Sequence, residues 1–157
     1  MKLGRWVLRA EPEITRALYA KVDRGGSDEC PCDLCENFVA ARDRAFPDGF
    51  LRALDELGVD PRKEIETTRW CRVREGVHRY GGWFHAVAVV ESGDEGRVYT
   101  EGAGSTFALE RLADGFSAGV LWSRLNLVRP SFRGHALVEI EFDAEVPWVI
   151  ATPEPAQ

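Results

Sequence analysis

The sequence predicts an α+β domain in which N-terminal helices pack on an antiparallel sheet, with a two-layer, sandwich-like arrangement as one option. Two observations support this fold class. Apolar residues recur at helical spacing in much of the stretch from about residue 11 to 66, whereas from about 67 to 150 they alternate with a period of two. The turns between the later strands are too short for helical crossovers, which favours antiparallel pairing.

The chain opens with a short segment of strand character. Residues 5–10 alternate Trp6, Leu8 and Ala10 with more polar positions, which is typical of a half-buried strand. Residues 12–22 fit two patterns, a helical stripe that begins with Pro12 in its first turn and a strand. We favour the helix because proline is well tolerated at that position. Residues 24–28 are rich in glycine and predict a loop.

Two helices follow with clearer signals. Apolar residues at helical spacing predict a helix from about Asp33 to residue 45, ended by Pro47. A second helix is expected over 50–57, with Asp48 as its N-cap and Gly58 in the left-handed conformation at its end. Asp60-Pro61 resembles a cap followed by a first-turn proline, so we expect a short third helical piece over 61–66.

The remainder predicts strands. We expect them at 68–74, 83–90, 97–100, 105–111, 117–122 and 136–144. The segment 83–90 is apolar on both faces and therefore belongs near the centre of a sheet. In 136–144, Val138, Ile140 and Phe142 alternate with acidic residues, which predicts one face in the core and one in water. Those acidic residues are Glu139, Glu141 and Asp143.

Length and composition describe a single domain over residues 1–157, with a tail at 151–157 that we expect to fray. The chain is 45% hydrophobic and 29% charged, with five tryptophans and eight phenylalanines for a core. A formal net charge of −6 argues against nucleic acid as the main partner. No secretory signal or membrane-length apolar run is present, so we expect a cytoplasmic protein with reduced cysteines.

Several segments together resemble a family of small bacterial proteins. Cys32-Asp33-Leu34-Cys35-Glu36-Asn37-Phe38 fits its Cys-x-x-Cys-x-Asn-aromatic motif, residues 57–61 fit Leu-Gly-Ile-Asp-Pro, and residues 82–85 fit Gly-Trp-aromatic-His. Glu141-Phe142 and Pro147-Trp148 extend the resemblance over most of the chain. The family has no established activity to carry over, so the resemblance implies only a bacterial single-domain protein.

The most unusual feature is a cysteine cluster, because Cys30, Cys32 and Cys35 lie within six positions. Cys30 and Cys32 project to the same side of an extended stretch, and Cys32 and Cys35 lie one turn apart if a helix opens at Asp33. Three thiolates placed in this way could bind zinc. The fourth ligand would be Cys71, or one of the histidines at 78, 85 and 135.

Two other interpretations of the cysteines stay open. Free cysteine often packs as a small hydrophobic residue, and thiols at a helix N-terminus can acquire redox reactivity. Catalysis by a cysteine–histidine pair is less favoured, because His85 lies in an apolar strand and His78 in an expected solvated turn. The acidic residues of 136–144 could supply paired carboxylates, although alternate acids on a strand usually form its solvated face.

The sequence therefore favours a cytosolic, non-enzymatic protein that binds an unidentified protein or small ligand, with a structural zinc at Cys30, Cys32, Cys35 and Cys71. The alternative is a small enzyme that uses a cysteine thiol or a carboxylate in the cleft between the helices and the sheet. Neither nucleic acid nor a membrane is expected as a partner.

Overall fold

The computed structural model describes residues 1–101 and 104–155, and the predicted α+β class is confirmed. Its helices are α1 (Pro12–Tyr19), η1 (Ser27–Glu29), α2 (Asp33–Ala45), α3 (Asp48–Leu57) and η2 (Pro130–Phe132). Its strands are β1 (Lys2–Leu3), β2 (Trp6–Ala10), β3 (Glu66–Arg74), β4 (Val77–Ser92), β5 (Arg97–Thr100), β6 (Gly104–Phe107), β7 (Glu110–Ala113), β8 (Phe116–Leu121) and β9 (Leu137–Pro147).

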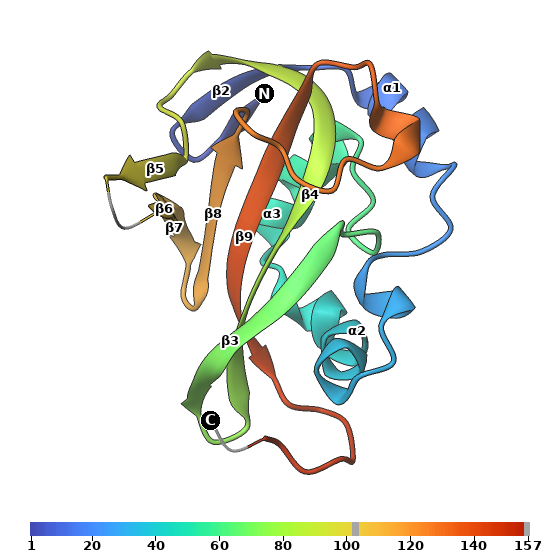
Figure 1. Ribbon diagram of the computed structural model, residues 1–157, viewed down its shortest axis with the longest axis vertical. Coiled ribbons are helices and arrows are strands. Elements are labelled where there is room, and N and C mark those ends of the chain that lie inside the picture. The colour runs from blue at the N-terminus through green and yellow to red at the C-terminus, as the bar shows by residue number, and fades with distance from the viewer. Residues whose placement is uncertain (102–103, 156–157) are drawn as a thin grey trace.

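The strands form one curled antiparallel sheet and a separate hairpin, rather than the two-layer sandwich that the sequence left open. The main sheet has the order β1-β2-β4-β9-β8-β7, and β3 pairs with the first half of β4 (Figure 1). Strands β5 and β6 pair only with each other among the described residues. Strand β4 is central because its 16 residues pair with β3, then β2, along one edge and with β9 along the other.

The helices cover one face of this sheet and enclose an aromatic core. Phe38 of α2 stacks on Phe142 of β9 at 6.1 Å between ring centroids, and Phe46 meets the same ring edge-on at 5.0 Å. Phe50 of α3 contacts Phe84 and Phe116 with its ring tilted, at 6.5 and 4.8 Å between centroids. Offset and edge-on pairs of this kind add to the free energy of burial. The helix face of the sheet is therefore the main core.

The N-terminal helical predictions hold with two corrections. Residues 12–19 form a helix, and α3 ends as expected with Gly58 at φ 75° and the Val59 amide bonded to the Leu54 carbonyl. Asp48, however, is the first residue of α3, and Pro47 occupies the N-cap position. The helix expected over 61–66 is absent, because Asp60 instead closes a turn by accepting the backbone amide of Arg62.

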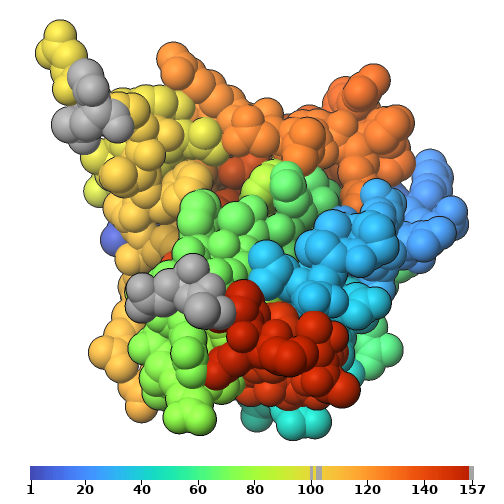
Figure 2. All heavy atoms as spheres, turned by 60° about the horizontal axis from the view of Figure 1, so that its bottom comes forward, coloured from blue at the N-terminus to red at the C-terminus, as the bar shows by residue number. Residues whose placement is uncertain are grey.

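The C-terminal tail contacts the domain through Glu154. The Glu154 carboxylate accepts the Gly76 amide at 3.0 Å and pairs with Arg72 and with His78 of β4. His78 is consequently buried in a strand, not solvated in a turn. Figure 2 shows the tail in red between the green β3–β4 end and the blue segment that leads into α2. Residues 156–157 lie outside the described residues.

The close packing of the sheet makes a testable prediction at Gly82. A Cβ atom there would lie 2.5 Å from the Glu66 carbonyl oxygen and 2.7 Å from the Phe142 ring, so Gly82→Ala must displace backbone or core. We expect a loss of about 1–3 kcal/mol in the free energy of unfolding, measured by denaturant titration. Gly49→Ala on α3 is the control, because only the end of Arg52 lies within 4 Å. It should stabilise the protein by up to about 1 kcal/mol, and equal losses would contradict this packing.

Candidate metal site

The three clustered cysteines come together where η1 ends and α2 begins. Cys30 follows η1 in extended conformation, Cys32 is the N-cap residue of α2, and Cys35 lies in the first turn of that helix. Their three Sγ atoms all lie within 4.8 Å of one another, and the Cys30 and Cys32 sulfurs are 3.2 Å apart. The predicted convergence is therefore confirmed, and the trio can hold a metal ion.

The other predicted ligands do not belong to this group. Cys71 is exposed on β3, opposite Arg79 in the β3–β4 register. Arg79 is bonded to Asp143, whereas the neighbouring Tyr80 donates its hydroxyl to the Leu34 carbonyl of α2. Adjacent residues of a strand point to opposite faces, so Arg79 and Cys71 lie on the face away from α2. His78, His85 and His135 also lie outside the group of close donor atoms.

The thiols of Cys32 and Cys35 differ in acidity. The backbone amide of Cys35 lowers the pKa of the Cys32 thiol, and a hydrogen bond donated by Cys30 adds to this effect. Burial raises the pKa of the Cys35 thiol, and its neighbouring sulfurs raise it further. Of these two thiols Cys32 therefore ionises more readily, and it lies at the helix N-terminus, where free amides favour an anion.

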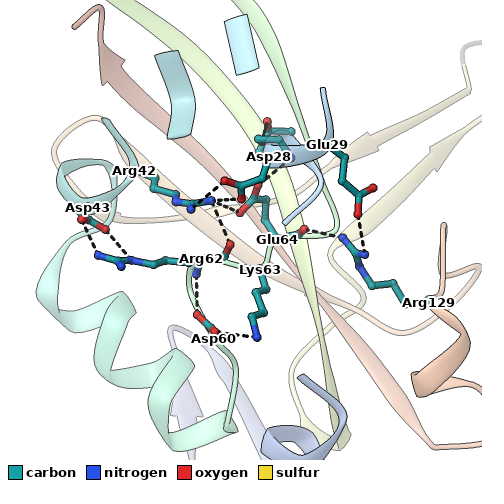
Figure 3. A network of polar contacts seen from close by, with 11 residues as sticks. Asp28, Glu29, Arg42, Asp43, Asp60, Arg62, Lys63, Glu64 and Arg129 are labelled. Carbon is teal, nitrogen blue, oxygen red and sulfur yellow. Dashed lines mark hydrogen bonds and ion pairs between the residues drawn. The ribbon is translucent and has the colours of Figure 1, made fainter. Parts of the chain in front are cut away.

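A buried ion-pair network fixes the segment that carries Cys30 (Figure 3). The Arg42 guanidinium of α2 donates to both carboxylate oxygens of Asp28 in η1, at 2.7 and 3.3 Å, and lies 3.6 Å from the Glu64 carboxylate. Glu64 is fully buried and accepts the backbone amide of Ser27 at 3.0 Å. Arg42 thus joins η1 to α2, the two elements that carry the cysteines.

The loop before η1 also approaches its neighbours closely. A Cβ on Gly26 would lie 2.2 Å from the Ile65 carbonyl oxygen, and one on Gly25 would lie 2.7 Å from the Glu64 carboxylate. The glycine pair at 25–26 is therefore required for close approach rather than for mobility. Ser27 completes the attachment through a 2.7 Å contact between its hydroxyl and that of Thr67.

Helix α2 is fixed independently of η1. The Asn37 side chain donates to the Pro147 carbonyl at 3.1 Å and accepts the Val149 amide at 2.7 Å. Tyr80 contributes the hydroxyl bond to Leu34 at 2.9 Å. The start of α2 is therefore held by β4 and the C-terminal tail, so both sides of the cysteine cluster are anchored to the sheet.

The acidic residues of β9 contradict the expected solvated face. Glu139 is 1% exposed and Glu141 is 4% exposed. Glu139 is bonded to Arg97 at 3.3 Å and accepts the Asn126 amide at 3.3 Å. His85 is buried 3.5 Å from Glu139, and neither of its ring nitrogens has a hydrogen-bond partner among the described residues. This buried polar layer was not predicted from the sequence. The pattern that could have indicated it is the alternation of acids in β9 together with a histidine in the apolar strand β4.

The arginines of β3 and of the start of β4 have polar partners in the structure, and Arg69 donates to His78 at 3.0 Å. Arg72 pairs with Glu154, Arg74 with Glu145 and Arg79 with Asp143.

No helix among the described residues is long and apolar enough to span a membrane. Comparisons with protein-family models, with curated proteins and with solved structures found no match to this chain.

The network around Glu64 predicts an unequal response to two arginine substitutions. Arg42 is 12% exposed, so Arg42→Ala leaves buried acidic groups without their cation, and we expect a loss of about 3–5 kcal/mol in the free energy of unfolding. Arg62 pairs with Asp43 in water, with both side chains more than 60% exposed. Arg62→Ala should therefore cost less than about 1 kcal/mol. Similar losses in denaturant titrations of the two variants would contradict the proposed role of Arg42.

The burial of Glu141 predicts a pH-dependent stability. Burial and the nearby Glu139 raise the pKa of Glu141 from 4.5 to about 8, so between these values the folded protein binds more protons than the unfolded chain. The stability that comes from keeping the Glu141 carboxyl protonated in the folded protein is fully present below pH 4.5. It is lost as the pH rises through about 8 and the buried carboxyl ionises. Glu141→Gln should therefore match the native protein near the lower limit and exceed it by a few kcal/mol above the upper one, at about 1.4 kcal/mol per pKa unit.

The control for this prediction is Glu56→Gln, which removes an exposed carboxylate from α3. Its free energy of unfolding should follow that of the native protein across the whole pH range. A Glu141→Gln curve that stays parallel to the native curve would show that Glu141 ionises normally.

Proposed function

We propose that this protein is a non-enzymatic binding domain in which Cys30, Cys32 and Cys35 hold a zinc ion. The observation that carries the proposal is the mutual approach of three sulfur atoms within 4.8 Å. A tetrahedral zinc with bonds of about 2.3 Å needs its sulfur ligands about 3.8 Å apart. The cluster thus requires only small side-chain shifts to bind the ion.

The chemistry of the cluster favours a thiophilic cation. Zinc is bound by thiolates, and its charge stabilises the deprotonated sulfur. The sulfurs of Cys30 and Cys32 oppose the ionisation of Cys35, which is part of the reason that its pKa is raised. A bound cation removes this repulsion, so binding releases protons and its affinity should rise with pH.

A structural role follows from the position of the cluster. Zinc would link the end of η1 to the first turn of α2, next to the Arg42–Asp28 ion pair that already joins them. Because the described residues bring no fourth protein ligand into the group, the fourth position is left to a solvent molecule or to a partner's side chain. Binding is favoured over thiol catalysis because no histidine lies within the cluster to act as a base.

Metal analysis tests the proposal directly. Protein purified without added zinc, then loaded and desalted, should contain one zinc per chain by inductively coupled plasma mass spectrometry. Cys32→Ser and Cys35→Ser should lose most of this zinc, because each removes one of three ligands. Cys71→Ser is the matched control and should retain it, since Cys71 lies outside the group.

Alkylation by iodoacetamide distinguishes the metal site from the alternative of a catalytic thiol. Zinc should protect Cys30, Cys32 and Cys35 while exposed Cys71 reacts at the same rate with and without the metal. A zinc content near zero, with stability unchanged by chelator, would reject the proposal. One fast-reacting cysteine that zinc does not protect would favour the enzyme instead.

A further inference from the structure

The face of the sheet opposite the helices carries a second candidate site, a cavity with a buried carboxylate. The cavity has a volume of about 210 Å³ and lies between β3 and the connection from β6 to β7. Glu141 of β9 lines it and is 4% exposed. The other side chains that border it include Trp70, Arg79, Phe107, Leu109 and Asp143.

The charges around Glu141 are one cation short. Four carboxylates project from β9 towards this face, and three of them have an arginine partner: Glu139 pairs with Arg97, Asp143 with Arg79 and Glu145 with Arg74. Among the described residues Glu141 has neither an ion-pair partner nor a hydrogen-bond donor. A largely buried carboxylate normally has such a partner, and the Glu141 carboxylate borders the cavity, where a group from outside the chain can reach it.

The walls of the cavity suit an organic cation. Trp70 is 57% exposed and lies across Gly81, where a Cβ would be 2.3 Å from the indole nitrogen. Phe107 is 41% exposed and ends β6 in the β5–β6 hairpin, where the Arg97 guanidinium lies over its ring. Aromatic side chains attract cations through their π-systems, and a carboxylate beside them adds a charged hydrogen-bond acceptor.

We propose that this cavity binds a small organic cation, such as a protonated amine or a guanidinium group, with Glu141 as its counter-ion and Trp70 and Phe107 as aromatic walls. The cation completes the pairing of the β9 carboxylates. Glycine at position 81 is part of the site, because any larger residue would push the Trp70 indole away from the cavity.

Binding of the cation is coupled to the loss of a proton from Glu141. Burial and the nearby Glu139 raise the pKa of Glu141 to about 8, so the carboxyl is largely neutral near neutral pH and must ionise to pair with the ligand. The charged groups that act on Glu141 are Glu139 and Asp143 on β9, which raise its pKa, and Arg97 on β5, which lowers it. Arg79 of β4 also lines the cavity and is bonded to Asp143. Affinity should therefore fall about tenfold for each pH unit below the pKa of Glu141.

The test is an NMR titration of the protein with n-propylammonium chloride, with n-propanol as the neutral ligand of the same shape. Propylammonium should produce saturable shifts of the Trp70 indole resonance and of the amides around Glu141, with a dissociation constant on the order of 1 mM above the pKa. Propanol should bind at least tenfold more weakly, since it cannot pair with the carboxylate.

Three variants separate the contributions. Glu141→Gln should weaken propylammonium binding at least tenfold and abolish its pH dependence. Trp70→Ala, a change at an exposed residue, should weaken it about two- to fivefold. Glu56→Gln removes an exposed charge far from the cavity and should change nothing. Equal binding of propanol, unchanged affinity in Glu141→Gln, or no saturable shift would each overturn the proposal.

Discussion

The cysteine cluster depends on the ion pair between Arg42 and Asp28. Buried Glu64 also lies beside the Arg42 guanidinium. The ion pair joins η1 and α2 across the short connection that contains the cysteines. Glu64 also fixes η1 directly, because its carboxylate accepts a hydrogen bond from the Ser27 backbone amide. Because α2 is separately bonded to β4 and to the tail through Tyr80 and Asn37, the start of the helix cannot move away from the sheet. The three sulfurs are therefore brought together by the fold around them as well as by their spacing.

The two faces of the curled sheet differ in composition, because one is aromatic and the other is charged. The helix face holds the aromatic core, in which Phe142 contacts Phe38, Phe46 and Phe84. The other face holds a layer of acids and arginines, which is buried at Glu139, Glu141 and Arg97 and more open towards Asp143 and Arg79. A charged layer of this kind adds little to stability, because desolvation offsets the attraction within each pair. Among the described residues Glu141 is the β9 carboxylate without a partner, and this is where we propose that a ligand contributes.

The sequence predicted what depends on local geometry and missed what depends on tertiary contacts. Cys30, Cys32 and Cys35 lie within one connection, so Pro31 and a helix beginning at Asp33 were enough to predict their convergence. Cys71 is far along the chain, and only the register of β3 with β4 shows that it faces the other way. The alternation in β9 showed correctly which acids share a face. It could not show that the segment containing Phe107 and Leu109 covers that face. His78 was misjudged for the same reason, because its partner Glu154 lies in a tail without periodicity.

The central claim is that the three clustered thiols act together as ligands of one ion, and X-ray absorption at the zinc edge of the loaded protein tests it most directly. We expect about three sulfur neighbours at roughly 2.3 Å and one lighter atom at about 2.0 Å. A first shell made only of nitrogen and oxygen, or one with a single sulfur, would show that the ion binds elsewhere and would contradict the account.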